Sequence, residues 1–201
     1  MRVQGSGDSS EMPKALIKPS GIKSLDFFSG YIEEQAKMEI KEGYIPGSIG
    51  RIAELHGTYY CDNWGFGLFF EAKVAGELSE FLGRYDKGRD RFLTAWTDER
   101  LEGSIAIDAL HADTEGAHLR WFIVSERLRG TGAGGLLINN AIHFCRKKGY
   151  KRIFLWTFEG LDAARHLYEK EGFRLVDQKE GAQWGTEVKE QRFLLPLDRI
   201  Y

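Results

Sequence analysis

The sequence contains few of the features that mark secreted, metal-clustered or membrane-spanning proteins. Only two cysteines, Cys61 and Cys145, occur among its 201 residues, which is too few for a disulfide framework or a cysteine metal cluster. No apolar run approaches the ~18 residues of a membrane span. The polar N-terminus, Met1 to Ser10, does not resemble a signal peptide. We therefore predict a reduced, cytoplasmic protein that holds no metal.

Neither sign of charge is in excess, because 28 Lys and Arg residues oppose 30 Asp and Glu residues. A net charge of -2 gives no electrostatic driving force toward nucleic acid or an anionic membrane. The chain also lacks a Gly-Lys-Ser/Thr tripeptide, which excludes a nucleoside-triphosphate P-loop. Its length and its 42% hydrophobic content are those of one globular domain with a proper core.

The spacing of apolar residues predicts an α+β domain over residues 37–201, with elements in the order β-α-α-β-β-β-α-β-α-β-β. The expected strands are 37–44, 91–97, 101–111, 117–124, 150–158, 173–176 and 187–197. The expected helices are 49–60, 69–85, a segment from the glycine cluster to Lys148, and 161–170. Residues 1–36 are expected to form a partly disordered N-terminal extension, with a short amphipathic helix beginning near Ser24.

A glycine cluster that follows the expected strand 117–124 is the strongest chemical signal in the sequence. Four glycines occur within residues 130–135, and they keep side chains away from main-chain N–H groups that are then free to face an anion. The positive end of the next helix dipole lies behind them. Arg127 and Arg129 add positive charge. This pattern predicts a pyrophosphate-binding turn.

Two motifs fit the cluster. Gly130, Gly132 and Gly135 satisfy the G-x-G-x-x-G pattern of dinucleotide-binding folds, and Glu159 closes the next strand, where such folds carry an acidic residue for the ribose. Against this pattern, Ser125 to Arg129 separate the strand from the glycines, and an antiparallel meander precedes them. The other motif is R-x-x-G-x-G, which occurs as Arg129-Gly130-Thr131-Gly132-Ala133-Gly134.

The second motif, together with Leu167-Tyr168-Glu169-Lys170-Glu171-Gly172-Phe173, resembles the GNAT superfamily of acetyl-CoA-dependent N-acetyltransferases. The resemblance covers about residues 37–197 and implies a mostly antiparallel central sheet flanked by helices. More narrowly, the chain resembles the acetyltransferase half of proteins that fuse this domain to a MarR-type regulator, in the segments His56-Gly57-x-x-Tyr60, Leu155-Trp156-Thr157 and Ala163-Ala164-Arg165. One departure is Leu161, where many members carry Asn.

The resemblance implies acetyl-CoA as co-substrate and assigns residues to it. The pyrophosphate would bind main-chain N–H groups of Arg129, Gly130, Thr131, Gly132, Ala133, Gly134 and Gly135. Backbone N–H groups of a splayed strand, here Phe122, Ile123 and Val124, would polarise the thioester carbonyl. Tyr168 matches the family's usual proton donor to the leaving thiolate.

The sequence leaves open which group deprotonates the acceptor amine. A lysine-like amine has a pKa of about 10.4 and must lose a proton to a carboxylate, a histidine or a chain of waters. Glu54, His56 and Glu71 border an aromatic loop and are the candidates. Aromatic faces suit a cationic amine before deprotonation. The side chains expected to line the acceptor pocket are Tyr59, Tyr60, Trp64 and Trp184.

The leading hypothesis is an acetyl-CoA-dependent N-acetyltransferase in which a primary amine, on a small molecule or a peptide, attacks the thioester directly. A non-catalytic CoA-sensing or protein-interaction module is the alternative, because Leu161 replaces the Asn and the base is unassigned. A nucleotide-dependent oxidoreductase rests only on the glycine pattern and Glu159. A homodimer that pairs through the last strands is compatible with the sequence.

Overall fold

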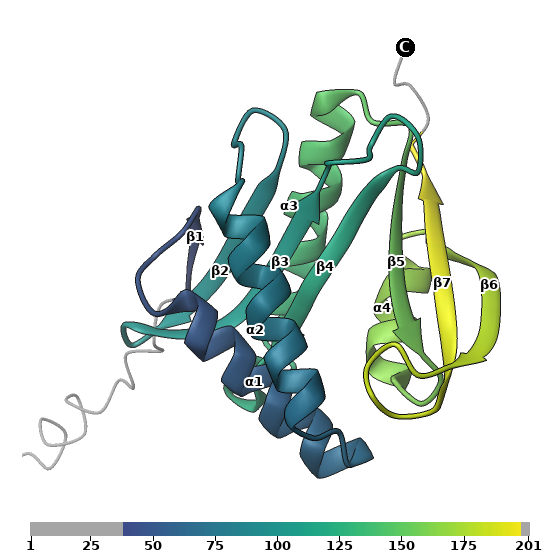
Figure 1. Cartoon of the computed structure of the whole chain (residues 1–201). Coiled ribbons are helices and arrows are strands. Elements are labelled where there is room, and N and C mark those ends of the chain that lie inside the picture. The colour runs from purple at the N-terminus through teal and green to yellow at the C-terminus, as the bar shows by residue number, and fades with distance from the viewer. Residues whose placement is uncertain (1–37, 198–201) are drawn as a thin grey trace, which may run out of the picture. The chain divides into compact units, whose positions relative to one another are not determined.

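The computed structural model describes residues 38–197, which form one mixed sheet with helices on both faces (Figure 1). The strand order is β1-β2-β3-β4-β5-β7-β6. Neighbouring strands are antiparallel except β4 and β5, which are parallel. The strands are β1 (Glu39–Glu42), β2 (Arg91–Thr97), β3 (Arg100–Asp108), β4 (Ala117–Val124), β5 (Arg152–Phe158), β6 (Arg174–Gly181) and β7 (Val188–Pro196). The predicted α+β class with a mostly antiparallel sheet is confirmed.

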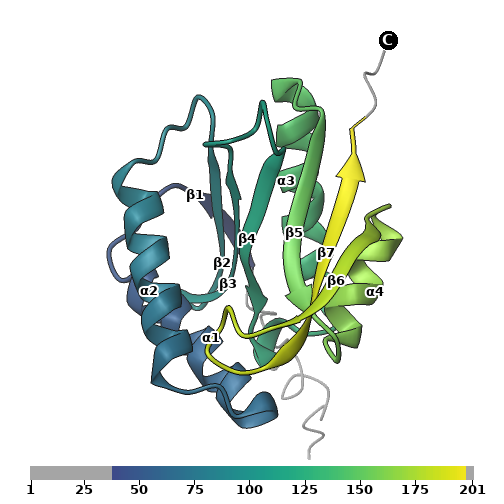
Figure 2. The same ribbon diagram turned by 45° about the vertical axis from the view of Figure 1, so that its right-hand side comes forward.

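Within residues 38–197, four α-helices cover the sheet. Helices α1 (Ser48–Trp64) and α2 (Leu68–Gly83) lie on one face, and α3 (Ala133–Lys148) and α4 (Asp162–Lys170) lie on the other (Figures 1 and 2). No helix within residues 38–197 is long and apolar enough to cross a membrane. The predicted extension over residues 1–36, with its amphipathic helix, lies outside the described residues and stays a prediction.

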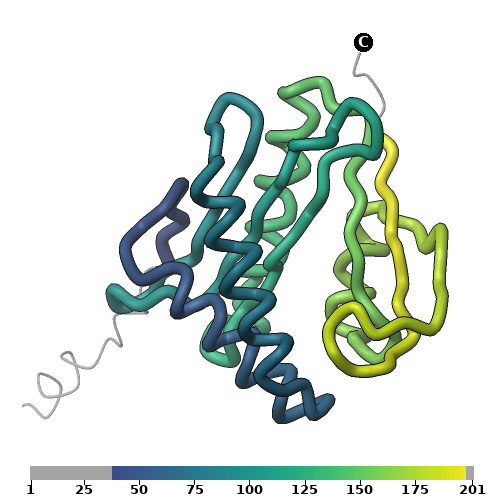
Figure 3. Tube along the Cα trace, viewed as in Figure 1, coloured from purple at the N-terminus to yellow at the C-terminus, as the bar shows by residue number. Residues whose placement is uncertain are grey.

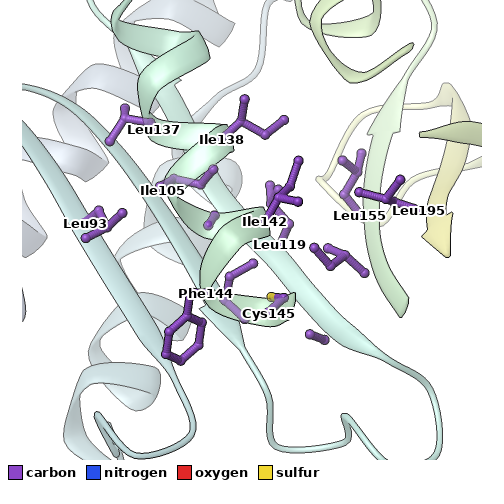
Figure 4. Close-up of a cluster of buried hydrophobic side chains, with 14 of the residues drawn as sticks. Leu93, Ile105, Leu119, Leu137, Ile138, Ile142, Phe144, Cys145, Leu155 and Leu195 are labelled. Carbon is purple, nitrogen blue, oxygen red and sulfur yellow. The ribbon is translucent and has the colours of Figure 1, made fainter. Parts of the chain in front are cut away.

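Each face of the sheet has its own apolar core. On the α3 side, Leu137, Ile138 and Ile142 recur at helical spacing and pack toward Ile105 and Leu119 of the sheet (Figure 4). Cys145 is buried in the same cluster, as the helical pattern predicts. On the α1 and α2 side, the core is built largely from aromatic residues and includes Phe66, Phe70, Phe81, Phe92, Trp121 and Phe158. The aromatic core therefore lies on the face where the acceptor pocket is expected.

Strand β4 carries a bulge at Trp121, and this bulge shapes the middle of the sheet. Trp121 has a φ of +45°, and the pairing with β3 shifts register between Ser104 and Ala106. The parallel pairing with β5 joins Ala117 to Ile153 and His118 to Phe154. Beyond those pairs the two strands diverge (Figures 1 and 3). The divergence opens a wedge between β4 and β5.

The first helix differs from its predicted bounds. The sequence predicts a helix that ends at residue 60, with the aromatic loop after it, but α1 continues to Trp64, so this boundary is wrong. The physical reason is that Tyr60 and Trp64 lie one helical turn apart and pack together, with ring centroids 5.8 Å apart. The helix then ends at Gly65, whose φ of +67° is left-handed. Strand β6 is also longer than the predicted 173–176, since its pairing with β7 continues to Gly181.

Candidate active site

The glycine turn between β4 and α3 is open to solvent. Gly130 and Gly132 have φ of +76° and +88°, and Gly132 precedes the first residue of α3. A Cβ on Gly130, Gly132 or Gly135 would meet no atom within 4 Å. Gly134 is different, because its Cβ would lie 3.3 Å from Leu167 Cδ2 of α4. Three glycines thus leave the turn uncovered, while Gly134 permits close packing beneath it.

The electrostatics of the turn favour an anion. All of α3 lies within the described residues, and its first turn carries no acidic side chain. The positive end of the helix dipole is therefore not neutralised by a carboxylate of that turn. Arg129 lies beside the turn, with its guanidinium 4.7 Å from the Tyr59 ring centroid and 3.4 Å from a Glu126 carboxylate oxygen. Arg127 instead pairs with Asp98 at 2.6 Å on the β2–β3 turn. Arg129 is therefore the basic side chain that joins the glycine turn to α1.

A pocket of about 250 Å³ lies between α1 and the end of β4. Five of the predicted site residues line it, namely Glu54, Tyr59, Ile123, Val124 and Arg129. The Glu54 carboxylate is 2.7 Å from an Arg51 nitrogen, and more than half of its side chain is exposed. Glu54 is thus an ion-paired surface group at the smaller pocket, and its role as proton acceptor stays a prediction.

A larger cavity, of about 420 Å³, occupies the wedge. It is lined from α1, α2, β4, β5, α4 and the loop before β7, and five predicted site residues meet there: His56, Tyr60, Phe122, Tyr168 and Trp184. Other lining residues are Phe70, Lys73, Val74, Glu77, His118, Leu119, Arg120, Trp121, Leu155, Trp156, Thr157, Phe158, Leu161, Ala164 and Gln183. The cavity therefore brings together segments that are distant in the sequence.

Tyr168 projects from α4 into this wedge and is buried. Its ring centroid lies 6.0 Å from that of Phe122 on β4 and 5.9 Å from that of Phe173. Burial raises the pKa of the Tyr168 phenol, and the nearby Tyr60 raises it further. The hydroxyl consequently keeps its proton at neutral pH, which is the state that a proton donor requires.

Two residues predicted for the acceptor side of the site, Trp64 and Glu71, line neither cavity. Trp64 packs edge-on against Phe158, a lining residue of the larger cavity, with ring centroids 5.4 Å apart. Glu71 is exposed on α2. Its carboxyl group lies against Gly57 of α1, where a Cβ atom would be only 3.1 Å from it. The functional roles of Trp64 and Glu71 stay predictions.

His56, the third candidate proton acceptor, lines the larger cavity. Its Nδ1 lies 2.8 Å from the Ile52 carbonyl oxygen. Since a carbonyl only accepts hydrogen bonds, Nδ1 carries the proton of the neutral ring and Nε2 carries a lone pair. Burial lowers the pKa of His56 to about 4, although the bond to Ile52 opposes the shift. The imidazole is therefore neutral across the physiological pH range.

Sequence reasoning missed a charged group in the same cavity. Glu77 accepts hydrogen bonds from Lys73 and from Arg120, and Arg120 also lies 3.4 Å from Asp108. Lys73 and Glu77 are one helical turn apart on α2 and continue the stripe of Phe70 that faces the sheet. This helical spacing was the signal available in the sequence.

His118 and Arg120 lie two residues apart on β4, a separation that places them on the same face of a strand. His118 stacks on Phe154 with centroids 4.4 Å apart. Burial lowers the pKa of His118 to about 3, and Arg120 contributes in the same direction. Burial would raise the pKa of Asp108, but hydrogen bonds from Arg84 and the Leu110 N–H bring it below its ordinary value. At neutral pH the histidine is uncharged and the carboxylate is ionised.

Low pH is expected to destabilise the fold through His56 and His118, whose pKa values are both lowered by burial. The folded-state pKa of His56 is about 4, below its ordinary value of 6.5. At pH values between these two, the unfolded chain binds more protons than the folded chain does. The free energy of unfolding therefore falls as pH drops through this window, by on the order of 3 kcal/mol for His56. Urea titrations at several pH values measure the fall. A His56→Gln variant should show a shallower pH dependence, and an unchanged slope would contradict the assignment.

Comparisons with known proteins agree with this architecture. The model of the acetyltransferase (GNAT) family matches residues 51–173, more than half of the chain. A GNAT-family acetyltransferase from Staphylococcus aureus superposes with a TM-score of 0.65 at 17% identity, over 81% of this chain and 100% of that one. An acetyltransferase from Streptococcus agalactiae gives 0.59 at 24% identity, over 80% and 98%. The ribosomal-protein-S18-alanine N-acetyltransferase of Escherichia coli gives 0.59 at 15% identity, over 81% and 95%.

At these identities the solved structures establish the fold, and the family model establishes the family. A search of curated proteins gave no match. The fold and its wedge define an acetyltransferase architecture. This chain belongs to the GNAT acetyltransferase family, whose members use acetyl-CoA as co-substrate and act on amines.

Proposed function

We propose that this chain moves the acetyl group of acetyl-CoA to a primary amine by direct attack of the amine on the thioester. The observation that carries the proposal is the position of residues 122–124 between the two cavities. Phe122 lines the larger cavity, while Ile123 and Val124 line the smaller pocket with Arg129. A ligand held at the glycine turn can therefore follow β4 into the wedge and reach Tyr168.

Main-chain groups of β4 are suited to polarise the thioester carbonyl. After His118 the strand separates from β5, so its edge faces the wedge and not a neighbouring strand. The bulge at Trp121 is fixed by the Ser104 hydroxyl, which donates to the Trp121 carbonyl oxygen at 2.6 Å. We propose that N–H groups of Phe122, Ile123 and Val124 stabilise the oxyanion that forms when the amine attacks.

The proton transfers are assigned to groups around the larger cavity. When the carbon–sulfur bond breaks, the leaving thiolate takes the proton of the Tyr168 hydroxyl. The amine must give up a proton as its new bond to carbon forms, and the neutral Nε2 of His56 is an acceptor that lines the same space. The aromatic side chains of Tyr60 and Trp184 would contact the acceptor, as the sequence predicted.

The test is to measure acetyl-CoA binding and acetyl transfer on the same full-length protein. Acetyl-CoA at a hundred times its dissociation constant should stabilise the fold by about 2.7 kcal/mol, and NAD or NADP should not. A panel of primary amines then reports turnover. We expect His56→Gln to lower kcat/KM by about tenfold or more, whereas His143→Gln, on the exposed side of α3, leaves it unchanged.

The outcomes separate the hypotheses. Stabilisation by acetyl-CoA with no acetyl transfer to any amine would favour the CoA-sensing module. Stabilisation by the nicotinamide cofactors alone would contradict the proposal and turn attention to Glu159. Full activity of His56→Gln would remove His56 from proton transfer and leave Glu54 and Glu71 as the candidates.

A further inference from the structure

The larger cavity is electropositive at one end. Among the described residues, the charged side chains that line it are Lys73, Glu77 and Arg120, two positive against one negative. His118 beside them is uncharged, because its pKa is about 3. Arg192 of β7 adds a further positive charge near this end. Its guanidinium lies 4.6 Å from the ring centroid of Phe154, the residue on which His118 stacks. This end of the cavity therefore suits a negatively charged group.

Hydrogen-bonding capacity leads to the same conclusion. A lysine ammonium has three N–H donors and an arginine guanidinium has five. Within residues 38–197, the carboxylates that contact these two cations are Glu77 and Asp108, and Asp108 is also bonded by Arg84 at 2.6 Å. Most N–H donors of Lys73 and Arg120 are thus left for solvent or a ligand. Glu77 already serves two cations, which makes it a poor partner for a third, such as an acceptor ammonium.

The other end of the cavity is aromatic. Tyr60 contacts Phe70 with centroids 4.8 Å apart, and Phe158 contacts Trp184 at 5.6 Å. Phe70 and Glu77 are two turns apart on α2, so the aromatic and charged ends are separated by about 10 Å along the helix. Tyr168 lines the same cavity as Tyr60, and its own ring packs on the aromatic side chain of Phe122, with centroids 6.0 Å apart. An acceptor that fills the cavity spans both environments.

We propose that the acceptor is a primary amine that also carries a carboxylate, joined through an apolar or aromatic body. Its amine lies at the Tyr168 end, its body lies against the aromatic wall, and its carboxylate bonds to Lys73 and Arg120. This inference rests on the proposed acetyl transfer, because it concerns the acceptor of that same cavity. It excludes polyamines and simple alkylamines as preferred acceptors, because they would bring only positive charge to the basic end.

Matched acceptor pairs test the proposal. 4-(Aminomethyl)benzoate is compared with benzylamine, and 4-(2-aminoethyl)benzoate with 2-phenylethylamine, so that each pair differs by one carboxylate across the ring and the two pairs cover a shorter and a longer separation. We expect kcat/KM to be about tenfold or more higher for the carboxylate member of at least one pair. Equal or better turnover of both carboxylate-free amines would overturn the proposal.

Lys73 is the residue to vary, because Arg120 lies in two ion pairs whose loss endangers the fold. Lys73→Met should remove the preference within the favoured pair, and Lys73→Arg should retain it. The control is Lys87→Met, an exposed lysine in the loop after α2, which should behave as the wild type. A preference that survives Lys73→Met unchanged would contradict the assigned site.

A binding measurement separates this inference from the proposed chemistry. Isothermal titration of the full chain with 3-phenylpropionate and with 3-phenylpropanol compares an anion with a neutral analogue, and neither carries an amine. We expect the carboxylate to bind about tenfold tighter in the wild type but not in Lys73→Met. Carboxylate binding without acetylation of any amine would support the anion site and overturn the proposed transfer. Equal binding of both probes would overturn the anion site, whatever the turnover.

Discussion

Replacement of Gly132 by Asp is expected to weaken acetyl-CoA binding by about 100-fold, which corresponds to about 2.7 kcal/mol. Gly132 has a φ of +88° and stands immediately before α3. An Asp side chain there strains the backbone by about 1–2 kcal/mol. It also brings a negative charge to the positive end of the helix dipole, where the pyrophosphate is proposed to bind. Isothermal titration with acetyl-CoA gives the dissociation constant.

Two further variants divide this effect into its parts. Gly132→Ala introduces the strain without the charge and should lose only part of the affinity. Gly149→Asp introduces a similar strain, at φ +74°, at the opposite end of α3. We expect Gly149→Asp to lower the melting temperature but to leave the dissociation constant unchanged. If Gly132→Asp bound acetyl-CoA as the wild type does, the glycine turn would not be the pyrophosphate site.

Replacement of Tyr168 by Phe is expected to lower kcat by about 100-fold to 1,000-fold, the usual contribution of a positioned acid. The substitution keeps the ring that packs against Phe122, Phe173 and Phe193. The melting temperature and the affinity for acetyl-CoA should therefore change little. Steady-state kinetics with a saturating amine, beside a binding titration, separate the loss of chemistry from a loss of binding.

Tyr44→Phe serves as the control for this substitution, since Tyr44 is exposed and lies before α1. A kcat of Tyr168→Phe within about threefold of the wild type would remove Tyr168 from the role of acid, because a lost general acid costs far more. Tyr60 would then be the next candidate, since it lines the same cavity and also carries a phenol hydroxyl.

Local signals in the sequence were sufficient for much of the fold. The glycine turn was predictable because Gly130 and Gly132 adopt left-handed backbone angles that glycine favours, next to a helix start. The strands and helices followed from the alternation and the helical spacing of apolar residues. The end of α1 was not predictable in this way, because polar residues such as Asp62 and Asn63 weaken the helical pattern, while the packing of Trp64 on Tyr60 extends it.

The composition of the larger cavity depends on contacts between distant segments, which sequence patterns do not encode. Arg120 on β4 meets Glu77 on α2, and His56 on α1 lines the same space as Tyr168 on α4. The bulge at Trp121 also has no local signature, because a positive φ at a tryptophan is set by its surroundings. Tyr168 could be proposed from the sequence because a family motif contains it, whereas Lys73 and Arg120 lie outside that motif.

The short pairing between β4 and β5 has a consequence for how acceptor range can change. Hydrogen-bonded strands are held about 4.8 Å apart by their backbones, but beyond His118 and Phe154 that restraint ends. The width of the wedge is then set by the volumes of side chains such as Leu119 and Leu155, which belong both to the buried cluster and to the cavity lining. Size changes at such positions would adjust which acceptors fit while the reacting groups stay in place. Substitutions in the hydrophobic core can therefore change the range of acceptors, in evolution or by engineering.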